Sequence, residues 1–331
     1  MSPFPDAFER GKQPMIDFKY LYKGLCGLAR AHRAGPLAGH LGAAVLAGYF
    51  FGEDHPGLAD KVYSAIEKDL NQIIQGEESL WFDPRKAGIT IPSLFDPFPE
   101  ERPQEEGIRS IAGALTTNID KLRESGHNVI FAAIALRALH DHPMYATPSI
   151  ITGIRKLVET FDAMGPGRGY YGKQRGWIAG DKVALPIADE FPQHKDQHAM
   201  AEAAIDELIR SASMRRQGFG GLFHIINHAA ALTELSLFGY RDLVQRGLAA
   251  HHQHVRLWRS LPDVEGELGP LKRAKHDPRT PEYWSADSPS QWSARLTHRI
   301  KTLYGFFTLL RLTKQSATRK QAEEQFLYLM T

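Results

Sequence analysis

Residues 39–52 read GHLGAAVLAGYFFG, and residues 126–139 read GHNVIFAAIALRAL. Both stretches open on a Gly-His pair and then stay apolar on almost every side of a helix. A third stretch, FHIINHAAALTELSLFG over residues 223–239, has the same character. A helix that is apolar all round is expected to be buried and surrounded by other helices. These stretches therefore predict the inner helices of an all-α fold.

Amphipathic segments flank each inner helix, with apolar residues at the spacing of one helix face. The unit is about three helices with the middle one buried, and it recurs about three times. The pattern predicts one all-helical domain over residues 1–331, folded as an α/α toroid or an irregular helical bundle. An open solenoid is the alternative, although its ordinary repeats span only about 20 to 50 residues. We expect outer helices over residues 16–33, 56–75, 108–123, 145–161, 199–215 and 241–261, and a C-terminal helix pair over residues 295–312 and 318–330.

Composition limits the class of function. The 40 Lys and Arg residues face 38 Asp and Glu residues, and this net charge of +2 argues against a nucleic-acid-binding surface. The longest apolar run, residues 41–51, is too short to span a bilayer, and the N-terminus shows no export signal. The single cysteine, Cys26, excludes an intramolecular disulfide and a cysteine-rich zinc site. We therefore expect a cytoplasmic protein with a small-molecule partner, no nucleic acid and no membrane; the sequence leaves a homo-oligomer open.

Five histidines lie at or near the starts of the inner helices and of the last apolar helix: His40, His127, His224, His228 and His298. Inner helices of an α/α toroid all run the same way, so these histidines should meet at one mouth. The positive end of a helix disfavours a charged imidazolium, and neutral imidazole is the form that binds metals. His224 and His228 are four residues apart, which lets two imidazoles hold one ion. The pattern predicts a histidine metal site; the alternative is that each histidine caps or packs at its helix start.

Other side chains near these histidines are candidates for chemistry. Lys301 lies three residues after His298 among apolar residues, where an inward-facing lysine is costly unless it is paired or neutralised. A lysine that reaches outwards to solvent is the simpler expectation. Asn128 and Asn227 each adjoin a candidate histidine and could polarise a carboxylate or carbonyl group, and Tyr304 could act as an acid.

Two segments outside the inner helices also stand out. GPGRGYYG, residues 165–172, is either a flexible connector or a lid that brings Arg168, Tyr170 and Tyr171 over the mouth. HHQHV, residues 251–255, lies on a predicted outer helix, and we interpret it as a solvated face or an interface.

The inner stretches resemble the questin oxidase-like proteins, which are helical enzymes of aromatic polyketide metabolism. The resemblance covers about 45 of the 331 residues, within GHLGAAVLAGYFFG, GHNVIFAAIALRALHDH and FHIINHAAALTELSLFG. It implies non-heme iron held by several histidines, with a modified lysine as an extra ligand. For this chain it implies His40, His127, His224 and His228 as ligands and Lys301 as the modified residue. In fold, the chain is also similar to the α/α toroids of terpenoid cyclases and polysaccharide lyases, although it lacks the acidic runs of the terpenoid enzymes.

The sequence supports three hypotheses about function, in the following order. The first is a non-heme metal oxygenase or related oxidoreductase, in which histidines hold Fe²⁺ beside a small apolar or aromatic substrate. The second is a metal-free lyase or isomerase on a toroid scaffold, with His127 or His228 as the base and Tyr304 or Tyr171 as the acid. The third is a non-enzymatic helical repeat scaffold whose groove binds a partner.

Overall fold

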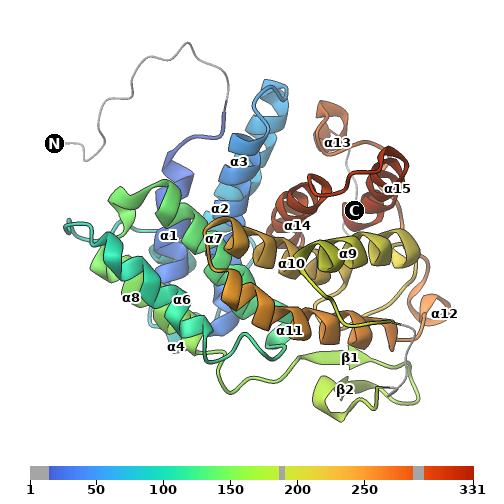
Figure 1. Ribbon diagram of the computed structural model, residues 1–331. Helices are drawn as coiled ribbons and strands as arrows, with labels where there is room; N and C mark the ends of the chain where they lie inside the picture. The colour runs from blue at the N-terminus through green and yellow to red at the C-terminus, as the bar shows by residue number, and fades with distance from the viewer. Residues whose placement is uncertain (1–14, 186–190, 286–293) are drawn as a thin grey trace.

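Four buried helices form the core of the computed structural model, which describes residues 15–185, 191–285 and 294–331. They are α2 (Gly39–Asp54), α7 (His127–Asp141), α10 (Leu222–Leu237) and α14 (Arg295–Leu310). Each packs against the next, and α14 packs back against α2, so the four make a closed ring. Figure 1 labels the four among the helices of the fold. The all-α prediction is confirmed, and the first three of these helices are the apolar stretches that the sequence singles out.

All four inner helices run in the same direction. Histidines near their N-terminal ends contact one another, as described below. Towards the opposite end, Arg137 of α7 bonds to Asp54 of α2, to Glu234 of α10 and to Tyr304 of α14. This common direction agrees with a toroid, and the finer choice between a toroid and an irregular bundle stays a prediction.

Outer helices surround this ring, each burying one face. For example, α1 packs on α2 and α8, and α11 packs on α9 and α10. The longer outer helices are α1 (Lys19–Ala31), α3 (Asp60–Gln75), α6 (Arg109–Leu115), α8 (Pro148–Glu159), α9 (Gln197–Ser211), α11 (Arg241–Arg259) and α15 (Ser316–Phe326). Short α-helices are α4 (Pro84–Ala87), α5 (Ile91–Leu94), α12 (Glu265–Leu268) and α13 (Pro281–Ser285), and 3-10 turns are η1 (Pro36–Ala38), η2 (Glu105–Ile108), η3 (Glu124–Gly126), η4 (Pro143–Tyr145), η5 (Gly180–Lys182) and η6 (Leu327–Leu329).

Two local predictions about secondary structure are wrong. The helix expected over residues 108–123 ends at Leu115, because the hydroxyls of Thr116 and Thr117 donate to backbone carbonyls three residues earlier and close a turn. The connector that contains GPGRGYYG holds an antiparallel hairpin, β1 (Arg168–Tyr170) and β2 (Trp177–Ala179). Strands of three residues are too short to show an alternating pattern in the sequence.

The contact between α1 and α2 depends on Gly42. A Cβ atom there would lie 2.4 Å from the backbone nitrogen of Leu28 and 2.8 Å from the carbonyl oxygen of Gly24, so the two helix backbones touch. We expect Gly42→Ala to lower the free energy of unfolding by about 1–3 kcal/mol, since the backbones must move apart. Gly113→Ala is the matched control, because that helical position faces open space, and it should raise stability by about 0.5–1 kcal/mol. Urea unfolding of both variants measures the difference; equal stabilities would contradict the close packing.

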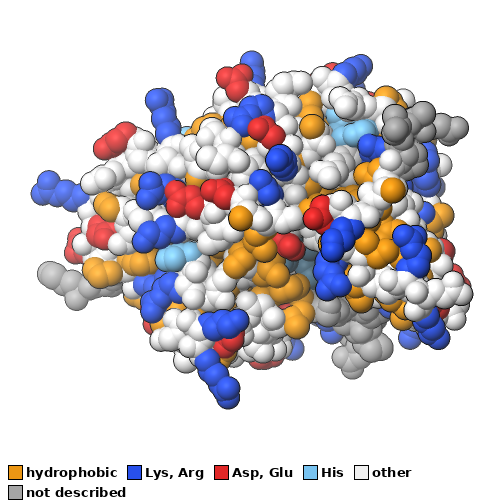
Figure 2. Space-filling view, turned by 90° about the horizontal axis from the view of Figure 1, so that it is seen from below, with side chains coloured by type: hydrophobic (Ala, Val, Ile, Leu, Met, Phe, Trp, Pro, Cys, Tyr) orange, Lys and Arg blue, Asp and Glu red, His pale blue; other side chains and the backbone are white. Residues whose placement is uncertain are grey.

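The face shown in Figure 2 carries basic and acidic side chains side by side, with apolar patches between them. This mixture matches the near balance of 40 basic and 38 acidic residues in the sequence. Among the helices in the described part of the chain, none has the length and apolar character needed to cross a membrane.

Candidate metal centre

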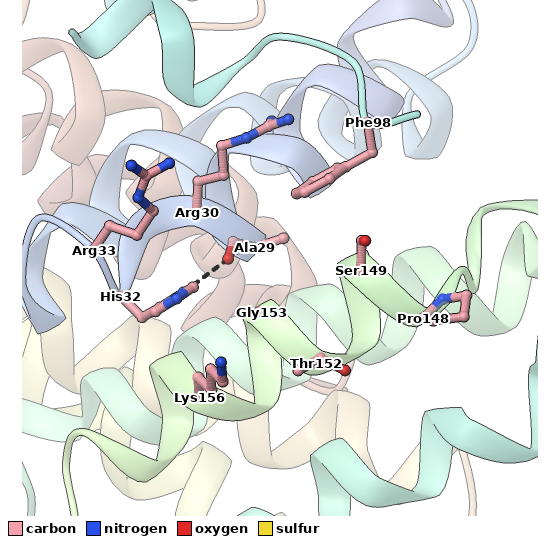
Figure 3. A pocket seen from close by; sticks show the side chains of 10 residues that line it. All are labelled: Ala29, Arg30, His32, Arg33, Phe98, Pro148, Ser149, Thr152, Gly153 and Lys156. Atoms are coloured by element: carbon pink, nitrogen blue, oxygen red, sulfur yellow. Dashed lines mark hydrogen bonds between the residues drawn. The ribbon is translucent and has the colours of Figure 1, made fainter. Parts of the chain in front are cut away.

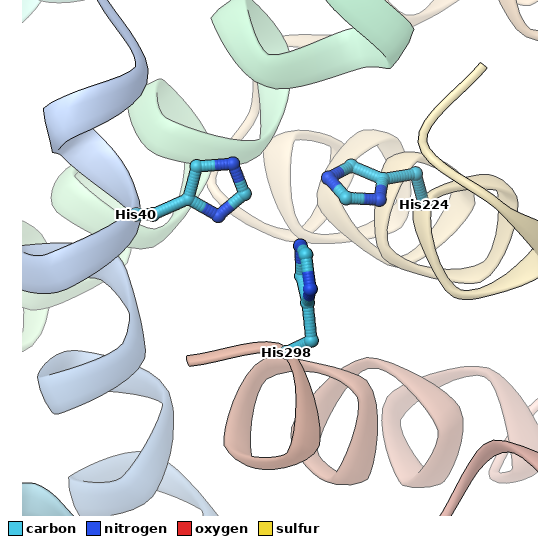
Figure 4. Close-up of side chains that lie close together, drawn as sticks. All are labelled: His40, His224 and His298. Atoms are coloured by element: carbon cyan, nitrogen blue, oxygen red, sulfur yellow. The ribbon is translucent and has the colours of Figure 1, made fainter. Parts of the chain in front are cut away.

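Four histidines meet at the N-terminal ends of the inner helices. His40 of α2, His224 of α10 and His298 of α14 point toward one another (Figure 4), and each offers a ring nitrogen within 4.8 Å of the other two. His127 of α7 joins them, because its Nε2 lies 2.7 Å from Nε2 of His40 and 2.9 Å from Nε2 of His224. All four rings are buried. The structure thus brings together one predicted histidine from each inner helix.

A left-handed turn sets the orientation of His127. Glu124, Ser125 and Gly126, directly before α7, have φ values of 38°, 61° and 86°. Residues other than glycine pay about 1–2 kcal/mol for this conformation. The turn aims the Glu124 carbonyl at Nδ1 of His127, which must donate because a carbonyl only accepts. Backbone strain of this kind collects at functional sites.

A second left-handed turn sets the orientation of His224 in the same way. Phe219, Gly220 and Gly221, directly before α10, have φ values of 48°, 73° and 77°. Here the carbonyl of Gly220 accepts from Nδ1 of His224. Two unrelated segments of the chain therefore use the same device to fix an imidazole at a helix start.

These two hydrogen bonds decide where the lone pairs point. With Nδ1 of His127 and of His224 both protonated, Nε2 of each neutral ring carries a lone pair. The two Nε2 atoms face each other at 2.9 Å, and neither has a proton to donate. Facing lone pairs repel unless a cation lies between them. A positively charged group between the two Nε2 atoms would remove this repulsion.

Burial makes it unfavourable for a proton to be the positive charge between Nε2 of His127 and Nε2 of His224. Burial lowers the pKa of His127 to about 3 and lowers the pKa values of His224 and His40 well below their usual range. All three rings are therefore neutral near pH 7, which is the ligand form. Nitrogens bound at 2.0–2.1 Å and at right angles around one metal ion are about 3 Å apart, close to the spacings of 2.7 and 2.9 Å found here. The donor set fits a divalent transition metal.

Lys301 completes the inner side of this group. Its amine contacts Nδ1 of His40, and its side chain is buried, so the expectation that Lys301 reaches outwards is wrong. Burial lowers its pKa to about 7, because the charged form is poorly solvated there. Near neutral pH a large fraction of this lysine is therefore an uncharged amine that can accept a proton or bind an electrophile.

A cavity of about 330 Å³ opens onto the imidazoles at the mouth of the ring. Trp81 stacks on His40 with ring centroids 4.3 Å apart, and Trp177 and Arg168 also line the cavity. Among the described residues, the indole Nε1 of Trp81 and the Nε of Arg216 are buried without a hydrogen-bond partner, and both residues line the cavity. The aromatic side chains on its walls suit a flat, largely apolar ligand.

Of the three residues predicted for a lid, only one lies at the mouth. Arg168 of β1 lines the cavity, and Nη2 of its guanidinium donates to the carbonyl of Trp177 at 3.1 Å. The Tyr170 hydroxyl donates to Glu267, and the Tyr171 hydroxyl bonds to Ser260 away from the imidazoles.

His228 lies outside the four-histidine group. It is one helical turn beyond His224, about 6 Å further from the mouth, and its Nδ1 lies 3.4 Å from Nδ1 of His254 on α11. His251 and His194 continue this second histidine cluster, with Nε2 of His194 3.1 Å from Nδ1 of His251. His251 and His254 are fully buried, so the interpretation of HHQHV as a solvated face is wrong. The structure thus separates the predicted pair His224 and His228.

The remaining candidates lie deeper in the core. Asn128 donates to the side-chain oxygen of Asn118 at 2.8 Å. Asn227 and Tyr304 line a small cavity beneath Lys301, and Tyr304 donates to Glu234 there. None of these three predicted residues lines the mouth cavity.

A second surface hollow of about 360 Å³ lies between α1 and α8 (Figure 3). Arg33 and Lys156 stand on its walls, and Nδ1 of His32 donates to the carbonyl of Ala29 at 2.9 Å. Among the residues that the structure describes, the grouping of three candidate ligands lies at the mouth instead. The chemistry is therefore best sought there.

No family model matches the sequence, and no curated protein or solved structure matches it either.

Proposed function

We propose that the protein is a metal-dependent oxidoreductase, in which histidines at the inner-helix starts hold non-heme iron beside a small apolar or aromatic substrate. The observation that supports this most is the approach of Nε2 of His127 to Nε2 of His224, 2.9 Å apart in a buried site. Imidazole suits iron, zinc, copper and nickel alike, and the choice of iron rests on the resemblance to the questin oxidase-like proteins.

His40, His127, His224 and His298 would be the ligands. Iron bound there would supply the reaction with molecular oxygen, including the electron transfer that side chains cannot perform. The chain itself would position the substrate: Trp81 offers an aromatic face over the imidazoles and excludes water.

The same proposal includes a small-molecule partner, rather than a nucleic acid or a membrane, and a cytoplasmic location. Lys301, the residue that the resemblance implies as an extra, modified ligand, contacts His40.

Lys301 also supports a second candidate function, a metal-free lyase or isomerase. Its pKa of about 7 is matched to a general base that works at neutral pH. This candidate predicts turnover in the presence of a strong chelator, with a rate that rises with pH as the Lys301 amine loses its proton.

Oxygen uptake tests the proposed reaction directly. Protein loaded with Fe²⁺ without oxygen is mixed with aerated buffer and with hydroxylated or carbonyl-bearing aromatic compounds. We expect uptake that depends on one of these compounds and stops when iron is removed. Compounds of similar size without aromatic rings are the control. Iron-loaded protein that consumes no oxygen with any aromatic compound, or full turnover in chelator, would contradict the proposal.

A further inference from the structure

The two left-handed turns that orient His127 and His224 are bonded to the same short segment of the chain. This segment, residues 165–170, reads GPGRGY and contains strand β1; we call it the strap. Residues of both turns line the mouth cavity, together with Gly167 and Arg168 of the strap. One segment thus lies beside both of the turns that fix an imidazole at a helix start.

The first half of the strap holds the turn before α7. The backbone N–H of Glu124 donates to the Gly165 carbonyl at 2.7 Å, and that of Ser125 donates to the Pro166 carbonyl at 3.2 Å. Glu124 and Ser125 have left-handed φ values of 38° and 61°. These two hydrogen bonds therefore hold the strained turn whose Glu124 carbonyl accepts from Nδ1 of His127.

The second half of the strap holds the turn before α10. The backbone N–H of Phe219 donates to the Arg168 carbonyl at 2.7 Å, and the N–H of Tyr170 donates to the Gln217 carbonyl at 2.8 Å. This is the turn whose next carbonyl, that of Gly220, accepts from Nδ1 of His224. The two turns are far apart in the sequence, and the strap joins them through backbone hydrogen bonds.

The Phe219 side chain is fixed in a slot made by two glycines of the hairpin. A Cβ on Gly169 would lie 2.4 Å from Cε2 of its ring, and a Cβ on Gly180 would lie 3.0 Å from Cε1. The ring is 1% exposed, and the Phe219 carbonyl accepts from Nε2 of His254 at 2.8 Å. A bulky residue with a φ of 48° costs about 1–2 kcal/mol. Such strain persists only where the surroundings fix the residue from several sides.

We propose that the strap is a positioning element for the imidazoles of His127 and His224. By binding both turns it holds the carbonyls of Glu124 and Gly220 in place, and these carbonyls hold the two Nε2 atoms 2.9 Å apart. Outer-shell partners that orient a ligand are worth about 10–100-fold in metal affinity. The inference rests on the proposed function only for the ligand, a divalent metal ion, because the orientation of the rings is measurable without it.

Gly169→Ala is the variant that tests this role. Its added methyl group meets the buried Phe219 ring, so the ring and its turn must shift. Gly165→Ala is the matched control, because it adds the same group to the same strap at a position with no described atom within 4 Å of the new Cβ. Gly180→Ala presses on the Phe219 ring more gently, and it replaces Gly169→Ala if that variant does not fold.

Nitrogen NMR of the metal-free full chain reports the two rings directly, because ring nitrogens with and without a proton have well-separated chemical shifts. In wild type we expect Nδ1 to carry the proton in both His127 and His224. Gly169→Ala should change the ring nitrogen shifts of His224 while the circular dichroism of the helices is kept, and Gly165→Ala should leave them unchanged. Wild-type shifts in folded Gly169→Ala protein would overturn the proposal.

Co²⁺ binding, followed by its visible absorption, separates a positioning role from a merely structural one. Gly169→Ala should bind Co²⁺ about 10–100-fold more weakly than wild type, with an altered absorption spectrum, and Gly165→Ala should match wild type. A Gly169→Ala protein that loses stability but keeps the wild-type affinity and spectrum would overturn the proposal. Wild-type protein that binds no Co²⁺, beside the expected change in His224, would contradict the metal-dependent function and still support the role of the strap.

Discussion

Protein carrying His224→Ala is expected to lose its bound metal almost completely. The substitution removes one of the two Nε2 lone pairs that face each other at 2.9 Å, together with the ring that the Gly220 carbonyl orients. Even outer-shell partners of a metal site are worth about 10–100-fold in affinity, so loss of a direct ligand should exceed that range. Elemental analysis of protein purified without a histidine tag, compared with wild type at about one ion per chain, measures the effect.

His228→Ala is the matched control for this experiment. Both histidines are buried on α10 and are one helical turn apart, but His228 faces His254 and not the four-histidine group. We therefore expect His228→Ala to lower thermal stability while the purified protein keeps its metal. Metal loss in the His228 variant with retention in the His224 variant would reverse our assignment of the ligands.

We expect the free energy of unfolding to fall in mild acid because of the second histidine cluster. Burial lowers the pKa of His254 and of His194 to about 4, and that of His251 well below its usual range. The unfolded chain binds protons at these histidines with pKa values near 6.5. Stability is therefore full above pH 6.5 and falls as the pH drops from 6.5 toward 4, since only the unfolded state takes up protons in that window.

His254 alone should contribute about 2 kcal/mol of lost stability between pH 7 and pH 5, where its pKa is about 4 in the folded chain. Urea unfolding at the two pH values measures this loss. His254→Gln keeps a side-chain N–H for the Phe219 carbonyl, which His254 reaches at 2.8 Å, but it does not titrate. The variant should lose less stability on acidification than wild type. An equal loss in the two proteins would show that His254 is already protonated or exposed.

The inner helices were predictable because a helix that is apolar on every side has few alternatives to burial. Gly39 and Gly126 mark the starts of α2 and α7 closely, since the Gly-His pairs sit where the chain enters the helix. The end of α6 was not predictable, because the threonines that close its last turn also occur within helices. The hairpin of β1 and β2 depends on a close approach to Gly218 from a distant segment.

The histidines of the site were predictable from their position in the repeated pattern, but their partners were not. A spacing of four residues places His224 and His228 on one side of α10, yet only His224 reaches the mouth. His251 and His254 count as polar in a periodicity analysis, which hides the fact that they lie on the buried face of α11. The left-handed turns carry a visible signal at their glycines, whereas nothing in the sequence marks Glu124 or Phe219 as strained.

Anomalous X-ray diffraction at the iron absorption edge tests whether the histidines at the mouth bind one metal ion. Crystals of the full chain, purified without a tag and loaded with Fe²⁺ under anaerobic conditions, would provide the data. We expect one strong peak within about 2.0–2.1 Å of the Nε2 atoms of His127 and His224, with His40 and His298 beside it. A peak only at His194, His251 and His254, or no peak with the His127 and His224 rings turned apart, would contradict it.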